Sequence, residues 1–584
     1  MTGDHRSPPV VIRGFGWRCR PTRPAALVFV FVALGLFAGC RRGTGDQRLR
    51  QGDQLVTATI SDPKTFNPLL SVDGASAAAT SDLFDGLVRL NTRTTLPEPM
   101  LAERWEHDEP GTTWTFHLRP GVRWHDGQPF TAEDVAFTLD AIFDARVPNS
   151  VKHILTVGGK RIDAEVVDPL TIRLRLAEPF APLLNSIGFA ILPKHLLGQA
   201  LDDGSFAQQW GIDTPPDKIV GTGPYRMTRY VPAQFLQYER NPDYWMRDEQ
   251  AGQLPRLKAQ TMLIVPDQNT IYLKFLDGQL HYYSPRPEEV DDVRRRAERL
   301  NANVTRVGID TGMLFVSFNR NPAHYLHGDR RDPRLDWFTD PHFVRAIAHS
   351  IDSDTMIRNT YFGHGEPAVS AVSPENKLFY DPNLEPYHYD LERARALLAE
   401  GGYLDRDGDG VREDTHGNPL EFELSTNAGN QVRERLCSIL KEDWTKLGMR
   451  VNYRPLEFST LVEKLSVNFD WDAMVMGFTG GVEPHNGANL LRSSGNLHLW
   501  HPNQPHPATE WEAAIDREVD LGARELDLDA RRQHYWKIQE ILHRELPLIQ
   551  LVRQEQFVAA RTYLRDFNLT PWGLFQPERI SVQP

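Results

Sequence analysis

The sequence predicts a mixed α/β protein with at least two lobes. Three observations support this prediction. The chain of 584 residues is longer than one hydrophobic core usually serves, its composition is that of an ordinary globular protein, and strand and helix patterns alternate along it. Hydrophobic residues make up 40% of the chain and charged residues 24%, which argues against disordered, collagen-like and multispanning membrane proteins.

The first 40 residues predict a secretory signal. Several arginines precede an uncharged apolar run, 25–38, which ends in Gly39-Cys40. A bilayer span needs about 20 apolar residues, so this run has the length of a signal-peptide core rather than of a transmembrane anchor. We expect residues 1–39 to be removed as a lipoprotein signal peptide and the polar residues 40–54 to form a tether.

Leu36-Phe37-Ala38-Gly39-Cys40 resembles the lipobox of bacterial lipoproteins, although phenylalanine stands where leucine is usual. The resemblance implies cleavage before Cys40 and lipidation of that cysteine. Each buried methylene of an acyl chain adds about 0.8 kcal/mol, so several chains would anchor the protein stably to a membrane. A soluble secreted protein in which Cys40 is incidental is the alternative.

Cysteine count and charge narrow the class of partner. Cys19 lies in the predicted signal and Cys40 is the predicted lipidation site, so Cys437 would be alone in the mature chain, without an intramolecular disulfide. The formal charge of −13 becomes −17 when residues 1–39, with five basic side chains and one acidic, are removed. Nucleic acid is a poor partner for such a surface.

Alternating residues predict an antiparallel sheet. The segment 114–118 alternates large apolar residues with threonine and histidine, as a half-buried strand requires. Asp168-Pro169 marks a hairpin turn, after which the segment 171–176 alternates isoleucine and leucine with threonine and arginine. Each strand would therefore have one apolar and one polar face.

Capping residues and apolar stripes predict several helices. Thr131 can cap a helix with Asp134 three residues on, before a stripe of apolar residues at helical spacing. Asp390 can cap a second helix, and Gly401-Gly402 would end it in the left-handed conformation. A third stripe spans residues 432–447 and precedes a strand-like segment.

Motifs that carry catalysis are missing from the sequence. It has no G-x-S-x-G elbow, no H-E-x-x-H helix, no P-loop and no dinucleotide fingerprint, and Gly221-Thr222-Gly223-Pro224 is read as a tight turn. We therefore expect neither an enzyme nor a cofactor. A hydrolase or another enzyme on the same scaffold is the alternative.

Two clusters of side chains contain residue types that can bind a metal ion. Asp405, Asp407 and Asp409 alternate before a glycine, as in calcium loops, but the twelfth position is His416 rather than glutamate. An acidic surface turn is the preferred interpretation and calcium binding the alternative. Histidines between 485 and 506 match no familiar ligand spacing, and no cysteine cluster joins them, so we expect no structural zinc.

Three consecutive segments, 99–106, 114–127 and 131–135, read PMLAERWE, WTFHLRPGVRWHDG and TAEDV. In order and spacing they resemble the signature region of the extracellular solute-binding proteins of family 5, which include the periplasmic oligopeptide- and dipeptide-binding proteins of ABC transporters. Later landmarks of that family are similar to residues 221–225, 241–245, 273–280 and 344–352. The resemblance covers nearly the whole chain after the predicted signal.

The resemblance implies the two-lobed, hinge-closing fold of periplasmic binding proteins, type II-like, with an extra subdomain inserted in lobe one. Mapped onto this sequence, lobe one comprises 55–90, 215–310 and 552–584, the inserted subdomain 91–214, and lobe two 311–551. Residues 314–319 and 548–552 would be the two extended crossings between the lobes, or ordinary core strands.

The resemblance also implies a function. The protein would be the substrate-binding protein of an ABC importer, capturing peptides or a similar small solute between its lobes and delivering it to permease subunits. It would be a monomer, lipid-anchored in the periplasmic or extracytoplasmic part of the cell envelope. A sensory or chaperone-like receptor, and an oligosaccharide or other non-peptide solute, are alternatives.

In peptide-binding members of the family, an aspartate before a proline-bearing loop commonly pairs with the peptide amine. Residues 472–477 are similar to the strand that leads there, but glycine stands at the aspartate position, and Glu483 could supply the missing carboxylate. The predicted solute contacts are Phe478, Thr479, Gly480, Gly481, Glu483, His485, Asn486 and Asn489 in lobe two, and Phe66, Asn67, Tyr282 and Tyr283 in lobe one. Core packing and turn formation are the alternatives.

Overall fold

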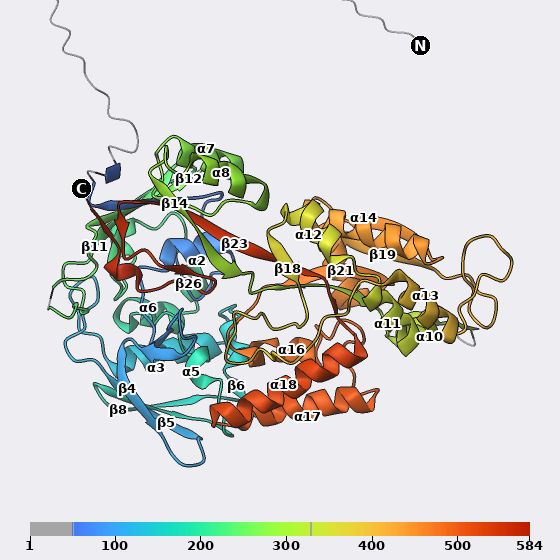
Figure 1. Cartoon of the computed structure of the whole chain (residues 1–584). Helices are drawn as coiled ribbons and strands as arrows, with labels where there is room; N and C mark the ends of the chain where they lie inside the picture. Colours follow the sequence, from blue (N-terminus) through green and yellow to red (C-terminus); the bar gives the residue numbers. More distant parts are fainter. Residues whose placement is uncertain (1–48, 51, 251, 328–329, 584) are drawn as a thin grey trace, which may run out of the picture. The chain divides into compact units, whose positions relative to one another are not determined.

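The computed structural model describes residues 49–50, 52–250, 252–327 and 330–583 (Figure 1). The predicted signal peptide and Cys40 lie outside the described residues. Within them, none of the helices combines the length and the apolar character that crossing a bilayer requires.

Two four-stranded sheets contain strands from the first 264 residues. One has the order β1 (Gln54–Thr59), β12 (Ala259–Ile264), β11 (Phe235–Arg240) and β10 (Tyr225–Val231), with β1 and β12 parallel. The other is antiparallel, with the order β4 (Ala102–His107), β5 (Thr113–Leu118), β9 (Thr171–Arg175) and β8 (Asp163–Asp168). This second sheet contains the strands predicted at 114–118 and 171–176, so the predicted antiparallel sheet is confirmed.

Two further sheets are connected directly by the chain at two places. In one, β23 (Val552–Arg561) pairs with β13 (Tyr282–Tyr283), β14 (Ala302–Ile309) and β18 (Gly365–Pro367). Figure 1 labels β14, β18 and β23 of this sheet. The other is five-stranded, with the order β20 (Arg450–Leu456), β19 (Glu421–Asn427), β21 (Ala473–Phe478), β15 (Met313–Phe318) and β22 (Ile549–Gln550). Both parallel and antiparallel pairs occur in it, so the architecture is mixed.

Short hairpins complete the strands: β2 (Val88–Leu90) with β3 (Pro97–Pro99), β6 (Thr156–Val157) with β7 (Lys160–Arg161), β16 (Leu326–His327) with β17 (Arg330–Arg331), β24 (Leu564–Arg565) with β27 (Ser581–Val582), and β25 (Leu569–Thr570) with β26 (Gly573–Leu574).

Helices alternate with these strands. Those before residue 300 are α2 (Gly74–Thr80), α3 (Ala132–Phe143), α4 (Val151–Ile154), α5 (Leu183–Ser186), α6 (Lys194–Asp202), α7 (Gln268–Leu276) and α8 (Val290–Arg296). Those after it are α9 (Pro322–Tyr325), α10 (Arg334–Thr339), α11 (Pro341–His349), α12 (Ser353–Tyr361), α13 (Leu391–Glu400), α14 (Gln431–Lys446), α15 (Phe458–Glu463), α16 (Ala488–Leu491), α17 (Glu510–Arg524) and α18 (Leu528–Glu545).

The predicted helix starts are confirmed. The carboxylate of Asp134 accepts the N–H of Thr131 at 3.0 Å at the start of α3. The carboxylate of Asp390 accepts the N–H of Arg393 at 2.8 Å at the start of α13. Beyond α13, Gly402 has a φ of +84°, the left-handed conformation that glycine adopts without a steric penalty.

Strand β15 is apolar except for Ser317, whose hydroxyl donates to the carbonyl of Pro547 at 2.9 Å, because both faces of the strand are covered. Phe315 packs into the core beneath α17 and α18. Its neighbours Val316 and Phe318 pack into a second core, which contains Trp444 of α14. A strand covered on both faces reads as a continuous apolar run rather than as an alternating one.

The chain passes between the last two sheets at two places. Strand β14 ends at Ile309 and β15 begins at Met313, while β22 ends at Gln550 and β23 begins at Val552. The segments predicted as crossings, 314–319 and 548–552, therefore lie largely in core strands, and the passage itself falls at 310–312 and at Leu551. The core strands and the passages between the sheets are thus adjoining parts of the same extended segments.

Candidate functional site

A groove of about 380 Å³ lies where the chain passes between the two sheets. We call it the crossing groove. It is lined by residues 310–314, 477–480 and 552–554, with Tyr361, Asn430, Val432 and Arg433. A volume of this size accommodates a small organic molecule, since ligand pockets commonly measure about 300–1,000 Å³.

Arg433, in the first turn of α14, supplies a positive charge to the crossing groove. Its guanidinium donates hydrogen bonds to Oδ1 of Asn427 at 2.8 Å and to the carbonyl of Gly477 at 3.3 Å, and lies 3.6 Å from Sδ of Met476. These acceptors are uncharged, and burial lowers the pKa of Arg433. A half-buried guanidinium with uncharged partners is well suited to bind an anionic group of a solute.

Arg553 fixes the wall of the groove instead. Its side chain is 3% exposed, and burial lowers its pKa to about 10. The guanidinium donates to the carbonyls of Ser370 at 2.7 Å, Ala371 at 3.1 Å and Asp310 at 3.3 Å, and also to that of Gly312. These bonds join the crossing segment to a loop from another part of the chain.

The structure brings three of the predicted contacts, Phe478, Thr479 and Gly480, to the crossing groove. The ring of Phe478 packs against that of Phe315, with centroids 5.8 Å apart. Gly480 lies so close to the crossing segment that a Cβ would fall 1.8 Å from the carbonyl oxygen of Thr311. Phe478 is thus anchored at one side and Gly480 is fitted closely to the other wall.

Glu483 has a different environment from the one expected. Its side chain is 3% exposed. Oε2 accepts hydrogen bonds from Arg531 at 3.0 Å and from Asn185 at 3.2 Å, while Oε1 accepts from Arg531 and from the N–H of His485 at 2.9 Å. An ionised carboxylate offers about four acceptor positions, and all are filled here, so the structure leaves Glu483 no free position for a solute amine.

The other predicted residues of this region lie outside the groove's lining. The ring of His485 packs edge-on against Phe180, with centroids 5.4 Å apart, and burial lowers the pKa of His485 to about 4. Asn489 donates to Oδ1 of Asn496 at 2.6 Å. Asn486 and Gly481 are exposed.

The four predicted residues of lobe one lie in packed surroundings. Phe66 and Asn67 are 0% exposed and Tyr283 is 6% exposed. The ring of Tyr282 packs against Phe567 with centroids 4.9 Å apart. Contact of these side chains with a solute stays a prediction, and the structure shows the core packing that was its alternative.

Sequence reasoning missed Arg433, although a signal was present. The N-terminus of a helix carries partial positive charge, so a cation in the first turn opposes the helix dipole. Arg433 occupies such a position in α14. Residues that break a local rule are often found at functional sites, and this one faces the groove.

The acidic turn is compact. Ligand oxygen atoms of Asp405, Asp407, Asp409 and Glu413 lie within 4.8 Å of one another, and the first three side chains are exposed. Asp405 accepts N–H groups of Gly408 at 2.7 Å and of Gly410 at 3.1 Å. These bonds are those of an acidic turn whose carboxylates accept its own main-chain N–H groups, and calcium binding stays the alternative.

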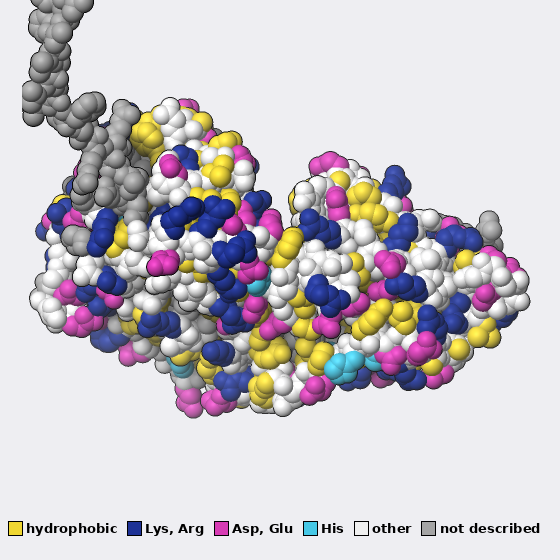
Figure 2. Space-filling model, turned by 45° about the horizontal axis from the view of Figure 1, so that its top comes forward, with side chains coloured by type: hydrophobic (Ala, Val, Ile, Leu, Met, Phe, Trp, Pro, Cys, Tyr) yellow, Lys and Arg dark blue, Asp and Glu magenta, His cyan; other side chains and the backbone are white. Residues whose placement is uncertain are grey.

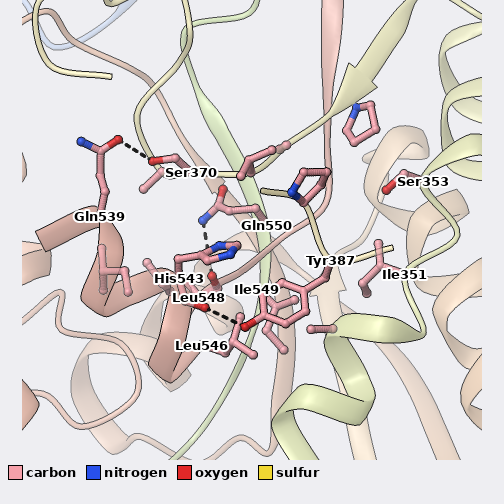
Figure 3. A pocket seen from close by; sticks show the side chains of 17 residues that line it. Ile351, Ser353, Ser370, Tyr387, Gln539, His543, Leu546, Leu548, Ile549 and Gln550 are labelled. Carbon is pink, nitrogen blue, oxygen red and sulfur yellow. Dashed lines mark hydrogen bonds between the residues drawn. The ribbon is translucent and has the colours of Figure 1, made fainter. Parts of the chain in front are cut away.

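A second cavity lies between β22 and α18 (Figure 3). Ser370 donates to Oε1 of Gln539 at 2.8 Å, and the hydroxyl of Tyr387 donates to the carbonyl of His543 at 3.2 Å. Its volume of about 40 Å³ is roughly a tenth of that of the crossing groove. This cavity is therefore too small for an organic solute.

The chain matches a family described as bacterial extracellular solute-binding proteins, family 5 Middle, over residues 97–498. The oligopeptide-binding protein AppA of Bacillus subtilis is 27% identical over 467 residues, 78% of this chain and 79% of AppA. The dipeptide-binding protein of Escherichia coli is 26% identical over 553 residues, 91% of this chain and 95% of its own.

Solved structures show the same fold. AppA from Bacillus subtilis in complex with a nonapeptide matches with a TM-score of 0.68 and 23% identity, over 91% of this chain and 99% of that one. NikA from Brucella suis in complex with Fe(III)-EDTA matches with a TM-score of 0.74 and 23% identity, over the same shares. The predicted mixed α/β, periplasmic-binding-protein fold is confirmed. Because the family match covers more than half of the sequence, the chain belongs to the family 5 bacterial extracellular solute-binding proteins.

Proposed function

We propose that this protein captures a small solute, a peptide or a molecule of similar size, in the crossing groove and delivers it to the permease of an ABC importer. Membership of the solute-binding family supports capture rather than catalysis. The observation that carries the proposal is the position of the groove, whose walls include the passage at 310–312 and residues 552–554, which directly follow the passage at Leu551.

Closure would follow from that position. A few backbone dihedrals at 310–312 and Leu551 can absorb a rotation of one sheet relative to the other. A solute that touches both crossing segments and the end of β21 has more contacts in a closed form than in an open one. Binding would therefore shift the population towards the closed form, which a permease can distinguish.

The chemistry of the groove favours a solute with an anionic group. Arg433 supplies a cation, and Phe478 supplies a flat apolar surface. The glycine at the aspartate position and the full coordination of Glu483 leave a free amine no partner in the segment after β21, and the carboxylate that lines the groove is that of Asp310. A peptide would bind through its carboxylate, and a non-peptide anion, such as the chelate bound by NikA, is the second candidate.

Capture would take place outside the cytoplasmic membrane. We propose that Cys40 is lipidated and that the polar residues 40–54 tether a monomeric binding protein to the membrane. Charges of both signs are interspersed over the face drawn in Figure 2, and the formal charge of −13 argues against nucleic acid as a partner.

The first test is native mass spectrometry of the protein beginning at Arg41, purified without denaturation. Co-purified short peptides would support the proposal, and a defined non-peptide mass would replace the peptide with that compound. The empty protein would then be titrated with tri-, tetra- and penta-alanine in a thermal-shift assay.

Arg433→Gln tests the groove itself, and Arg435→Gln is the matched control, because Arg435 is exposed on the same helix. We expect Arg433→Gln to weaken binding of the co-purified solute at least tenfold and Arg435→Gln to leave it unchanged. Equal binding by the two variants would place the solute elsewhere.

A further inference from the structure

A buried ion pair joins Arg531 of α18 to Glu483, in the segment that follows β21. Both side chains are at most 5% exposed, and the guanidinium contacts both carboxylate oxygens. Nε of Arg531 donates to the carbonyl of Gly522 in α17 at 2.7 Å, and this bond orients the two terminal nitrogens of the guanidinium towards Glu483. Burial disfavours the charged guanidinium, but the field and hydrogen bonds of Glu483, together with the nearby Tyr535, outweigh it and raise the pKa of Arg531.

Glu483 lies near the end of a segment, residues 477–485, that we call the groove loop. Its first part lines the crossing groove, and Gly480 contacts the carbonyl of Thr311 so closely that no side chain fits. Nδ2 of Asn376 donates to the carbonyl of Val482 at 2.8 Å. The groove loop is therefore held at its middle by main-chain contacts and at its end by Arg531.

Glu483 also connects the groove loop to the first half of the chain. Nδ2 of Asn185 donates to its carboxylate at 3.2 Å. Next to this bond, the N–H of Ala181 donates to the carbonyl of Ala523 at 2.8 Å, and Arg524 pairs with Glu178 at 2.6 Å. The end of the groove loop thus lies where the segment 178–185 meets the α17–α18 hairpin.

We propose that Arg531 is a positioning residue for solute capture. Through Glu483 it holds the groove loop where Phe478, Thr479 and Gly480 line the crossing groove, and it ties that loop to the segment 178–185. Only a few residues separate the groove-lining part from Glu483, so the loop links solute contact to the contact between these two parts of the chain. This inference rests on the proposed function for the identity of the process, but its structural part can be tested without a solute.

The test is hydrogen–deuterium exchange of the protein beginning at Arg41, for wild type and for Arg531→Met. Methionine retains much of the packing against Phe379 and Tyr535, whose ring centroids lie 5.2 and 5.4 Å from the guanidinium carbon. We expect exchange of the groove-loop amides to rise at least tenfold, with exchange in β19 unchanged.

Arg532→Met is the matched control, because Arg532 is the next arginine of α18 and pairs with the exposed Asp529 at 2.8 Å. Arg531→Lys keeps the charge without the bidentate geometry and should give an intermediate exchange rate. If Arg531→Met and Arg532→Met exchange alike in the groove loop, the proposal is wrong. Arg531→Lys decides the question if Arg531→Met does not fold.

The double variant Arg531→Met/Glu483→Gln distinguishes a purely structural role of Arg531 from the proposed positioning of the groove loop. Removing one partner leaves an uncompensated buried charge, whereas removing both relieves that penalty. We expect the double variant to regain thermal stability while its groove loop still exchanges fast. Recovery of slow exchange together with stability would overturn the positioning role.

The solute arm uses tri-alanine and isothermal titration calorimetry. We expect Arg531→Met to bind at least tenfold more weakly than wild type and Arg532→Met to bind equally well. If wild type does not bind tri-alanine but the exchange results are as expected, the peptide assignment fails and the positioning stands. If wild type and Arg531→Met bind tri-alanine equally, the positioning fails and peptide capture stands.

Discussion

Gly480 shows how a single residue can be set by a neighbour that is distant in the sequence. Its φ is not positive, so no backbone conformation requires glycine, yet the space for a side chain is filled by the main chain of residue 311. Gly481, the next residue, has open space where its Cβ would lie. The glycine pair that replaces the family's aspartate therefore contains one glycine imposed by packing and one that is not.

Gly480→Ala should lower the free energy of unfolding by about 1–3 kcal/mol or more, because a backbone carbonyl cannot move aside as a side chain can. Gly481→Ala is the control and should change stability by less than about 0.5 kcal/mol. Thermal unfolding of the two variants checks this. Equal stability of both would mean that the crossing segment shifts freely away from the groove loop.

His485 makes stability depend on pH. Its pKa of about 4 in the folded protein, lowered by burial, lies below the usual value of about 6.5. Between these values the unfolded chain binds more protons, so the stabilisation is complete above about pH 6.5 and is lost as the pH falls towards 4. The contribution is at most about 3 kcal/mol.

His485→Asn should therefore reduce the loss of stability between pH 7 and pH 4.5 in urea denaturation. The exposed His506→Asn should behave as wild type does. Burial raises the pKa of Asp85 to about 6, and this opposes the trend in all three proteins, so the comparison between variants carries the result. Identical pH profiles for wild type and His485→Asn would contradict the expectation.

Helix α14 joins the core to the groove. Its buried face, which includes Leu436, Leu440 and Trp444, packs on β19 and β20, while Arg433 at its start reaches the crossing groove. The apolar stripe fixes the rotation of the helix, and that rotation decides where Arg433 points. A change that loosens the stripe should therefore affect binding as well as stability.

Leu440→Ala should cost about 2–5 kcal/mol of unfolding free energy, because the side chain is 0% exposed and a cavity would remain. Ser438→Ala, on the exposed side of α14, should be nearly neutral. Urea denaturation of the two variants, fitted with one common dependence of the unfolding free energy on urea concentration, measures both changes in stability. A loss below about 1 kcal/mol for Leu440→Ala would show that the core around α14 collapses into the cavity.

At the scale of the whole molecule, the β15 and β23 sheets are joined at 310–312 and at Leu551. Strand β23 pairs with β13, β14 and β18, and it is continuous with β22 of the five-stranded sheet except for Leu551. A solute in the crossing groove touches residues on both sides of this connection. Because a ligand at 100 times its Kd stabilises the state it binds by about 2.7 kcal/mol, thermal shift is a sensitive readout of capture.

Cys40→Ala should release the protein from the membrane fraction of cells that express the full chain, because the acyl acceptor is removed. Cys437→Ala is the control, since its thiol is buried and burial raises its pKa far above the usual value. Fractionation and immunoblotting check this. Membrane retention of Cys40→Ala would contradict lipid anchoring at this residue, and recovery of the wild type in the soluble fraction would favour the soluble secreted alternative.

Much of the fold could be predicted because its signals are local. The capping of α3 by Asp134 spans three residues, and the alternation in β5 and β9 spans six residues or fewer. The segment 114–127, with its flanking motifs, was sufficient to suggest the family. Such patterns depend on the backbone period and on neighbours in sequence, which any reader of the chain can see.

The candidate site could be predicted only in part because its contacts are long-range. Glu483 was expected to face a solute, but its partners Arg531 and Asn185 lie 48 and 298 residues away. Arg553 meets Asp310 across 243 residues. No period in the sequence encodes such meetings.

The sequence by itself determined the solute-binding family, the mixed α/β class, the predicted signal and the helices and strands with local caps and alternation. Only the tertiary structure decided that Phe478, Thr479 and Gly480 line the crossing groove with Arg433, and that Glu483 is held by Arg531. The physical reason is that local elements follow from hydrogen bonding and apolar period within a few residues. A site is made where distant segments pack, and burial then decides which charges stay free for a solute and which are paired.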